Sequence, residues 1–116
     1  NIAVIPSITG LVGHWSLNEG SGTTTDDNSD NNNIGTRKPS CPDCPSWTTN
    51  GRFGNALQFD GTNDYVQVPD HDSLDLTSAL TIAAWIRPIS TSIMTIVEKF
   101  SGGYAGYRVF VVYYIL

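Results

Sequence analysis

The chain has 116 residues, of which 40% are hydrophobic and 15% charged, and its formal net charge is −5. This length suits one domain with a single core, and the abundance of Gly, Asn, Ser, Thr and Asp is typical of a turn-rich β protein. An acidic chain repels phosphate backbones, so nucleic acid is not an expected partner. No run reaches the ~18 apolar residues of a spanning helix, which argues against membrane insertion.

The first half of the chain predicts one strand followed by a long loop. Residues 1–10 read as a short lead-in, and residues 11–116 are expected to form the domain. Alternating apolar positions over residues 11–17 predict a strand. The polar stretch 18–50 is predicted to be a loop, and a loop of that length is usually functional or held by a metal or a disulfide. The chain begins without a Met or a signal peptide, which is typical of a mature or excised fragment.

The second half shows more regular alternation after a turn at Asn50-Gly51. The predicted elements are strands at 55–60, 64–68, 80–87, 94–100 and 107–116, with one helical turn at 73–76. We expect the first two strands to form a hairpin with Leu57, Phe59, Val66 and Val68 facing inward. Strand 80–87 is apolar on both faces and is expected at the centre of a sheet. The pattern predicts an all-β protein, an antiparallel β-sandwich.

The two cysteines lie close together in the run Cys41-Pro42-Asp43-Cys44. We interpret them as a local disulfide, which would fit an oxidising compartment. A zinc site would need a second pair of ligands, and His14 and His71 do not have a zinc-like spacing. A thioredoxin-like role would require a strand–helix context, whereas Pro and Ser flank the pair.

Several segments, in this order, resemble the laminin-G-like, concanavalin A-like jelly-roll family. They are LVGHWSLNEGSG (11–22), GRFGNALQFDGTNDYV (51–66), SLDL (73–76) and LTIAAWIRP (80–88). The resemblance covers most of residues 11–110. It implies a jelly-roll sandwich at the cell surface or outside the cell that binds a glycan or a surface protein. Family members continue with strands that complete both sheets, whereas this chain stops at VFVVYYIL (109–116). We expect either completion by a partner chain, assembly with further copies, or a partial sequence with an altered tail.

The resemblance also directs attention to sugar-binding side chains. Such modules hold sugars with exposed aromatic rings and polar loop groups, and the predicted ligand-binding residues here are Trp47, Tyr104, Asn63 and Asp64. The alternative for Trp47 is a packing anchor within the long loop. Trp15 and Trp85 lie on patterned strands, and we interpret them as core residues.

Oxygen-rich turns make calcium the expected cofactor, in a structural role. The predicted ligands are Glu19, Asp26 and Asp60, and two of them, Glu19 and Asp60, lie where a strand enters a loop. The acidic run 26–33 lacks the central Gly and the final Glu of a helix–loop–helix calcium site. The alternative is that these side chains cap turns through their own hydrogen bonds.

Catalysis is not expected, because glycoside hydrolysis needs two carboxyl groups roughly 5–9 Å apart and no predicted strand carries such a pair. The sequence leaves two functions open. The first is a non-catalytic extracellular binding or adhesion module. The second is a structural subunit of a self-assembling extracellular fibre or oligomer. That subunit would be joined through the apolar C-terminal strand, which has the composition of a cross-β segment.

Overall fold

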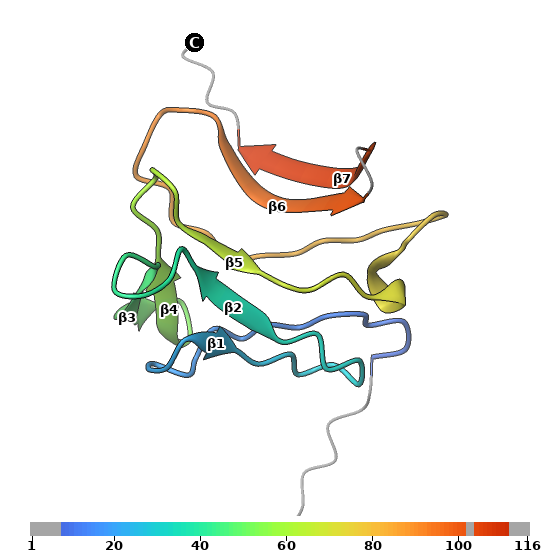
Figure 1. Ribbon diagram of the computed structural model, residues 1–116, viewed down its shortest axis with the longest axis horizontal. Coiled ribbons are helices and arrows are strands. Elements are labelled where there is room, and N and C mark those ends of the chain that lie inside the picture. Colours follow the sequence, from blue (N-terminus) through green and yellow to red (C-terminus); the bar gives the residue numbers. More distant parts are fainter. Residues whose placement is uncertain (1–7, 102–103, 112–116) are drawn as a thin grey trace, which may run out of the picture. The chain divides into compact units, whose positions relative to one another are not determined.

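The computed structural model describes residues 8–101 and 104–111 (Figure 1). In this part of the chain all strand pairs are antiparallel and no α-helix occurs, so the predicted all-β class is confirmed. Residues 1–7 of the expected lead-in and 112–116 of the expected last strand lie outside the described residues. The chain divides into two compact units, Asn1–Leu74 and Asp75–Leu116.

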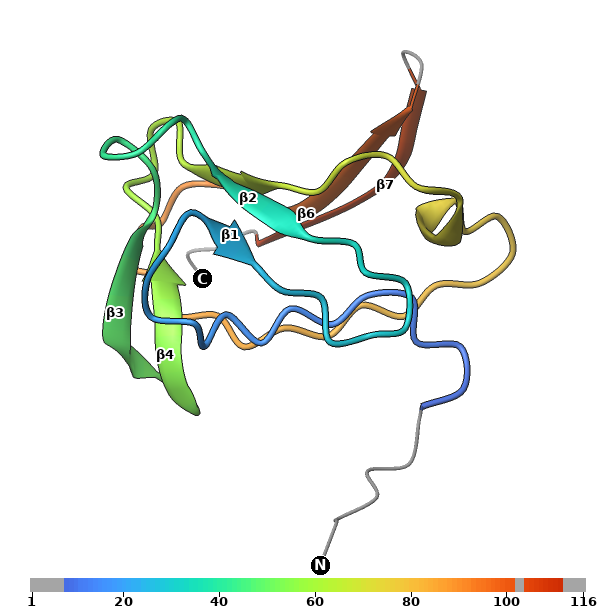
Figure 2. The same ribbon diagram turned by 60° about the horizontal axis from the view of Figure 1, so that its bottom comes forward.

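Residues 8–74 of the first unit contain two small sheets. β1 (Thr24–Thr25), β2 (Gly35–Lys38) and β5 (Tyr65–Gln67) form a three-stranded sheet in the order β1-β2-β5. β3 (Ser46–Gly51) and β4 (Gly54–Gln58) form a separate hairpin. Figure 2 shows this hairpin at one end of the three-stranded sheet.

The predicted hairpin between 55–60 and 64–68 is wrong. β4 pairs with β3 and β5 pairs with β2, so the two predicted neighbours belong to different sheets. The β3–β4 hairpin closes at Gly54, whose φ of 95° suits glycine because a Cβ would be strained there. The alternation of apolar residues predicts which face of a strand is buried, but it does not predict which other strand pairs with it.

Other strand predictions also need correction. Residues 11–17 form no strand and contribute only an isolated antiparallel bridge between Trp15 and Asp27. Residues 80–87 carry no strand. The stretch 18–50, predicted to be a loop, contains β1, β2 and β3. These three strands are polar, so a search for apolar alternation misses them.

In its described residues, the second unit contains one hairpin, β6 (Met94–Ser101) with β7 (Tyr104–Val111). β6 confirms the strand predicted at 94–100, and β7 begins three residues before the predicted last strand. Glu98 and Arg108 face each other across the hairpin and form an ion pair. A second ion pair joins Lys99 to Asp75 at 3.0 Å.

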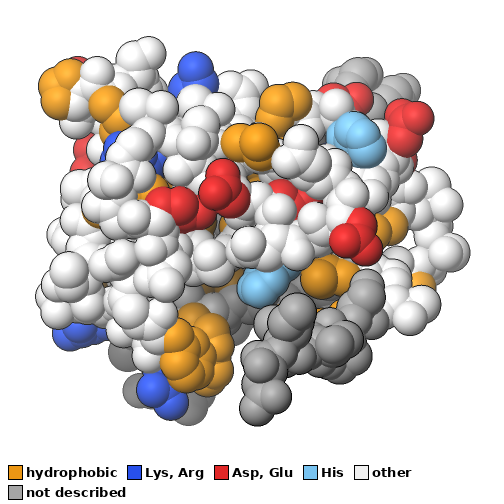
Figure 3. All heavy atoms as spheres, turned by 90° about the horizontal axis from the view of Figure 1, so that it is seen from below, with side chains coloured by type: hydrophobic (Ala, Val, Ile, Leu, Met, Phe, Trp, Pro, Cys, Tyr) orange, Lys and Arg blue, Asp and Glu red, His pale blue; other side chains and the backbone are white. Residues whose placement is uncertain are grey.

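The apolar core is small. Among the described residues, the buried apolar side chains are Cys44, Pro45 and Leu74. Leu74 ends a 3-10 turn, Asp72–Leu74, so the helical turn predicted at 73–76 is present but begins one residue earlier and ends two residues earlier. Many larger apolar side chains reach the surface (Figure 3), and Trp85, interpreted from the sequence as core, is 73% exposed. Polar interactions must therefore hold much of the first unit in place.

One carboxylate organises the N-terminal part of the first unit. Oδ1 of Asp27 accepts hydrogen bonds from the backbone N–H groups of His14 at 2.8 Å and Ser29 at 2.9 Å. Oδ2 accepts from the N–H of Asn33 at 2.8 Å and the hydroxyl of Ser29 at 2.7 Å. The buried Asn33 then donates from its side-chain amide to the carbonyl of Val12. The sequence left two roles open for the acidic run, calcium binding and the capping of turns through side-chain hydrogen bonds. At Asp27 the structure shows the capping role.

The centre of the three-stranded sheet leaves no room for a side chain at Gly35. A Cβ there would lie 2.4 Å from Oγ1 of Thr25 and 2.6 Å from Cγ1 of Val66. Two residues further along β2, the buried guanidinium of Arg37 donates to the carbonyl of Pro45. β2 therefore joins the sheet to the segment that leads into β3.

The Asp27 network predicts a specific acid sensitivity. Burial raises the pKa of Asp27, but hydrogen bonds from His14, Ser29 and Asn33 outweigh it and leave the pKa below its ordinary value of 3.8. A depressed folded-state pKa stabilises the fold above pH 3.8, and this contribution is lost as pH falls through the lower folded-state value. Asp27→Asn should lower the free energy of unfolding at neutral pH by about 1–3 kcal/mol, because an amide cannot satisfy the same donors.

The measurement is urea unfolding from neutral pH into the acid range, with the exposed Asp30→Asn as the matched control. In Asp27→Asn the free energy of unfolding should fall less steeply as the pH is lowered. In Asp30→Asn it should fall as steeply as in the unchanged chain. Equal stability of the two variants at neutral pH would contradict the role given to Asp27.

Candidate functional site

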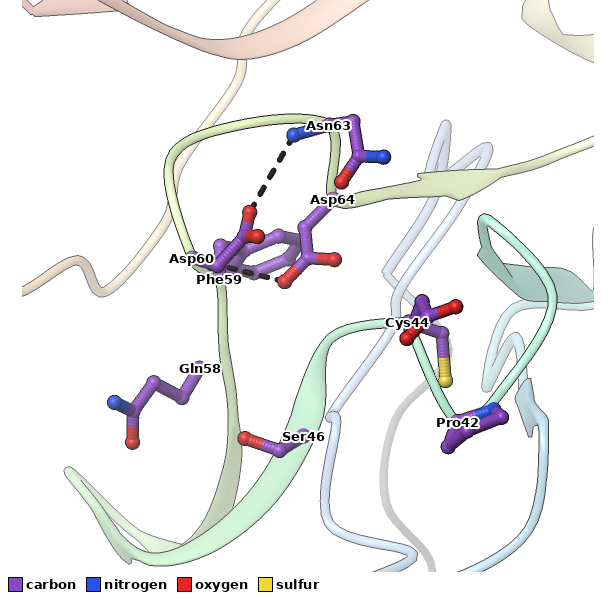
Figure 4. A pocket seen from close by; sticks show the side chains of 9 residues that line it. Pro42, Cys44, Ser46, Gln58, Phe59, Asp60, Asn63 and Asp64 are labelled. Carbon is purple, nitrogen blue, oxygen red and sulfur yellow. Dashed lines mark hydrogen bonds between the residues drawn. The ribbon is translucent and has the colours of Figure 1, made fainter.

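The first unit contains an open pocket of about 450 Å³. Its volume falls in the range of roughly 300–1,000 Å³ that is common for small-molecule sites. The residues that line it come from the disulfide loop, the start of β3, the end of β4 and the turn that follows β4: Pro42, Asp43, Cys44, Ser46, Gln58, Phe59, Asp60, Asn63 and Asp64. Figure 4 shows their side chains around one space.

The disulfide loop forms one wall of this pocket. Cys41 and Cys44 are joined by a disulfide, with their Cα atoms 4.7 Å apart, as the sequence predicts. Behind the wall, the guanidinium of Arg37 donates to the carbonyls of Pro45 and Gly22. These bonds anchor the end of the loop to a buried side chain. The wall is therefore fixed both by the disulfide and by the buried cation of Arg37.

The turn after β4 forms the other wall. Oδ1 of Asp60 accepts hydrogen bonds from the N–H groups of Thr62 at 2.8 Å and Asn63 at 3.4 Å. The N–H of Asp60 in turn donates to Oδ2 of Asp64 at 2.9 Å. The N–H of Thr62 is the main reason why the pKa of Asp60 lies below its ordinary value, and those of Asn63 and Asp64 add to the effect. Asp60 is therefore ionised at neutral pH.

Phe59 places an aromatic ring in this polar setting. It was predicted to face inward, but β4 ends at Gln58, and the side chain of Phe59 is 45% exposed and lines the pocket. The strand alternation stops one residue before it, so the inward prediction is wrong. The turn-forming run Asp60 to Asn63 directly after it was the signal that the strand ends early.

The predicted ligand-binding residues fall into three places. Asn63 and Asp64 lie together in the pocket. Trp47 is half-buried outside the lining, where its indole N–H donates to the carbonyl of Gly22 at 3.1 Å and its ring lies 5.2 Å from the Arg37 guanidinium. Tyr104 is the first residue of β7 in the second unit, and its side chain lies outside the described part. Sequence reasoning missed Asp43, Ser46 and Gln58, which carry no motif.

The predicted calcium ligands also separate. Glu19 and Asp26 are neighbours, since Oε1 of Glu19 accepts the N–H of Asp26 at 2.8 Å. Asp60 lines the pocket, and neither Glu19 nor Asp26 is part of that lining. Among the described residues, no group of three or more His, Cys, Asp and Glu side chains is arranged to hold a metal ion. Oε2 of Glu19 is buried without a hydrogen-bond partner in the protein.

Comparisons with protein-family models, with curated proteins and with solved structures find no match. The likeness to the laminin-G-like family remains an interpretation of the sequence segments. Within residues 8–101 and 104–111, no helix is both long and apolar enough to span a membrane. The pocket, rather than a relative, is therefore the starting point for a functional proposal.

Removal of the disulfide should have a modest global effect and a strong local one. The closed loop spans only four residues, so Cys41→Ala with Cys44→Ala should lower the free energy of unfolding by about 2 kcal/mol. The backbone amides of Asp43, Cys44 and Ser46 should exchange with solvent faster, whereas the amides shared by β2 and β5 should keep their protection. Hydrogen exchange on the double variant measures both effects, and uniform loss of protection across the first unit would contradict a local role.

Proposed function

We propose that this chain is a non-catalytic extracellular recognition module that binds a glycan in the pocket between the disulfide loop and the 60–64 turn. The observation that carries the proposal is the exposed Phe59 ring in a pocket otherwise lined mainly by polar groups. The C–H face of a sugar ring can lie on an aromatic ring, while its hydroxyl groups need hydrogen-bond partners. The pocket offers both kinds of contact at one place.

The polar groups of the pocket match the chemistry of sugar hydroxyls. Asp60 and Asp64 present carboxylates, and a hydroxyl that donates to a carboxylate forms a charge-assisted hydrogen bond. Gln58 and Asn63 carry amides that both donate and accept, and the hydroxyl of Ser46 does the same. A pocket that combines an apolar face with a few placed polar groups is typical of small-ligand sites.

The ionised state of Asp60 supports a role in binding and not in catalysis. A glycosidase needs one carboxyl group with a raised pKa as the general acid. The pKa of Asp60 is instead lowered by the N–H groups of the turn that follows it. Asp60 is therefore suited to accept hydrogen bonds and to stay charged.

The remaining parts of this proposal concern fold and location. A laminin-G-like jelly roll would build on small antiparallel sheets such as β1-β2-β5 and β3-β4, with strands from a partner completing the sandwich. The Cys41–Cys44 disulfide suits a protein of the cell surface or the extracellular space. A surface protein is the second ligand class. A typical protein interface buries ~800 Å² on each partner, which is a much larger surface than this pocket offers. The pocket therefore suits a sugar ring better than a protein surface.

The glycan proposal predicts that Phe59→Ala weakens binding about tenfold or more, because truncating an aromatic anchor removes most of its contact energy. Retention of the purified chain on a glycan array identifies a ligand, and calorimetric titration then compares the variants. Phe53→Ala is the matched control, since Phe53 is 69% exposed and does not line the pocket. Equal losses in both variants would contradict a site at Phe59.

Calcium remains part of the proposal as a structural ion near Glu19. The unpartnered Oε2 of Glu19 is the observation that favours it, because a buried carboxylate oxygen without a donor is costly. Bound calcium should raise the melting temperature by mass action, and a chelator should lower it again. An identical melting temperature with calcium and with chelator would contradict this prediction.

Self-assembly is the second candidate function, and exposed apolar side chains of the second unit favour it. Ile86, Ile89 and Ile93 are 47%, 88% and 70% exposed. A lone two-stranded hairpin such as β6–β7 is marginally stable in water and gains from further strands. Size-exclusion chromatography separates the two functions, since a recognition module should elute as a monomer and a structural subunit as a large species.

A further inference from the structure

The charged side chains that line the pocket are all of one sign. Three of its nine lining residues, Asp43, Asp60 and Asp64, are acidic, and none of the nine is Lys, Arg or His. Two cationic residues of β2 lie outside this lining: Lys38, which pairs with Tyr65 next to Asp64, and the buried Arg37. The guanidinium of Arg37 points to the backbone carbonyls of Pro45 and Gly22.

We infer that the pocket selects its ligand by charge, taking neutral and amino-bearing sugars and rejecting carboxylated or sulfated ones. This inference rests on the proposed glycan-binding function and adds the ligand class to it. It follows from the position of the acidic side chains around a space that an aromatic ring also lines, not from the number of acids alone. Phe59 supplies the apolar contact that every sugar ring can use, so the carboxylates decide between rings of different charge.

Two of the three carboxylates are held in place by the fold. Asp64 accepts the N–H of Asp60, and Asp60 accepts the N–H groups of Thr62 and Asn63. These bonds keep the side chains from turning away when an anion approaches. They also lower the pKa of Asp60, so protonation cannot relieve the repulsion at neutral pH.

Coulomb's law gives the size of the effect. In water, one unit charge roughly 7 Å from another changes affinity about threefold. Three carboxylates together should therefore disfavour a singly charged anion by about 20- to 30-fold at low salt. Screening should reduce this discrimination as ionic strength rises. A neutral sugar should show little dependence on salt, and an amino sugar should bind more weakly as salt is added.

The experiment uses one array on which each sugar backbone appears as the neutral, the amino and the sulfated or uronic form. Binding of the whole chain is measured at low and at physiological salt, both with calcium and with a chelator, so that the effect of a bound cation on the local charge is measured separately. We expect the chain to be retained by the neutral and amino forms of a sugar backbone. We expect it not to be retained by the sulfated or uronic form of the same backbone. Equal retention of the anionic forms overturns the charge inference and leaves the glycan proposal standing. Absence of retention for every form overturns both.

Asp43→Asn provides the decisive variant. Asp43 is exposed in the disulfide loop and lines the pocket, so the substitution removes one charge with little change of shape. It should reduce the discrimination against anionic forms about threefold, as expected for one unit charge. Asp30→Asn makes the same change in net charge at an exposed position outside the lining and should leave discrimination unaltered. If both variants shift it equally, the effect comes from the net charge of the chain and the inference fails.

Discussion

The carboxylate of Asp27 is the interaction on which the first unit depends most. It accepts three backbone N–H groups and one hydroxyl, and so it brings His14, Ser29 and Asn33 to a single point. Asn33 extends this network, since its carbonyl accepts the indole N–H of Trp15 at 2.8 Å. With so few apolar side chains buried, matched polar groups define the path of the chain here. The same residues lead directly into β2.

The order created by this network reaches the pocket through β2. Arg37 lies at the centre of that strand, opposite Val66 of β5, and its guanidinium holds the carbonyl of Pro45 behind the disulfide loop. The pairing of Ser46 with Gln58 then joins the two walls at the base of the pocket. The pocket is thus assembled from segments that are separated in sequence but fixed by backbone hydrogen bonds and one buried cation.

Sequence reasoning succeeded where the signal was local. The all-β class, the disulfide, the turn near Leu74 and the strand beginning at Met94 each follow from short runs of residues. It failed to predict which strands pair, because apolar alternation carries no information about the neighbouring strand in the sheet. Asn63 and Asp64, which were named through the family resemblance, line the pocket, whereas Phe59 was misplaced because alternation was extended one residue too far. The wall formed by the disulfide loop depends on the bonds from Arg37 to Pro45 and Gly22, which join residues distant in sequence.

The close approach at Gly35 has a consequence for the history of this sequence. Since Thr25 and Val66 fill the space that a Cβ would need, a side chain at this position requires smaller neighbours on both flanking strands. Divergent sequences that keep this sheet should therefore vary these three positions together, with glycine exchanged only where its neighbours have shrunk. Such correlated change would be a record of the β1-β2-β5 strand order that is independent of any overall similarity.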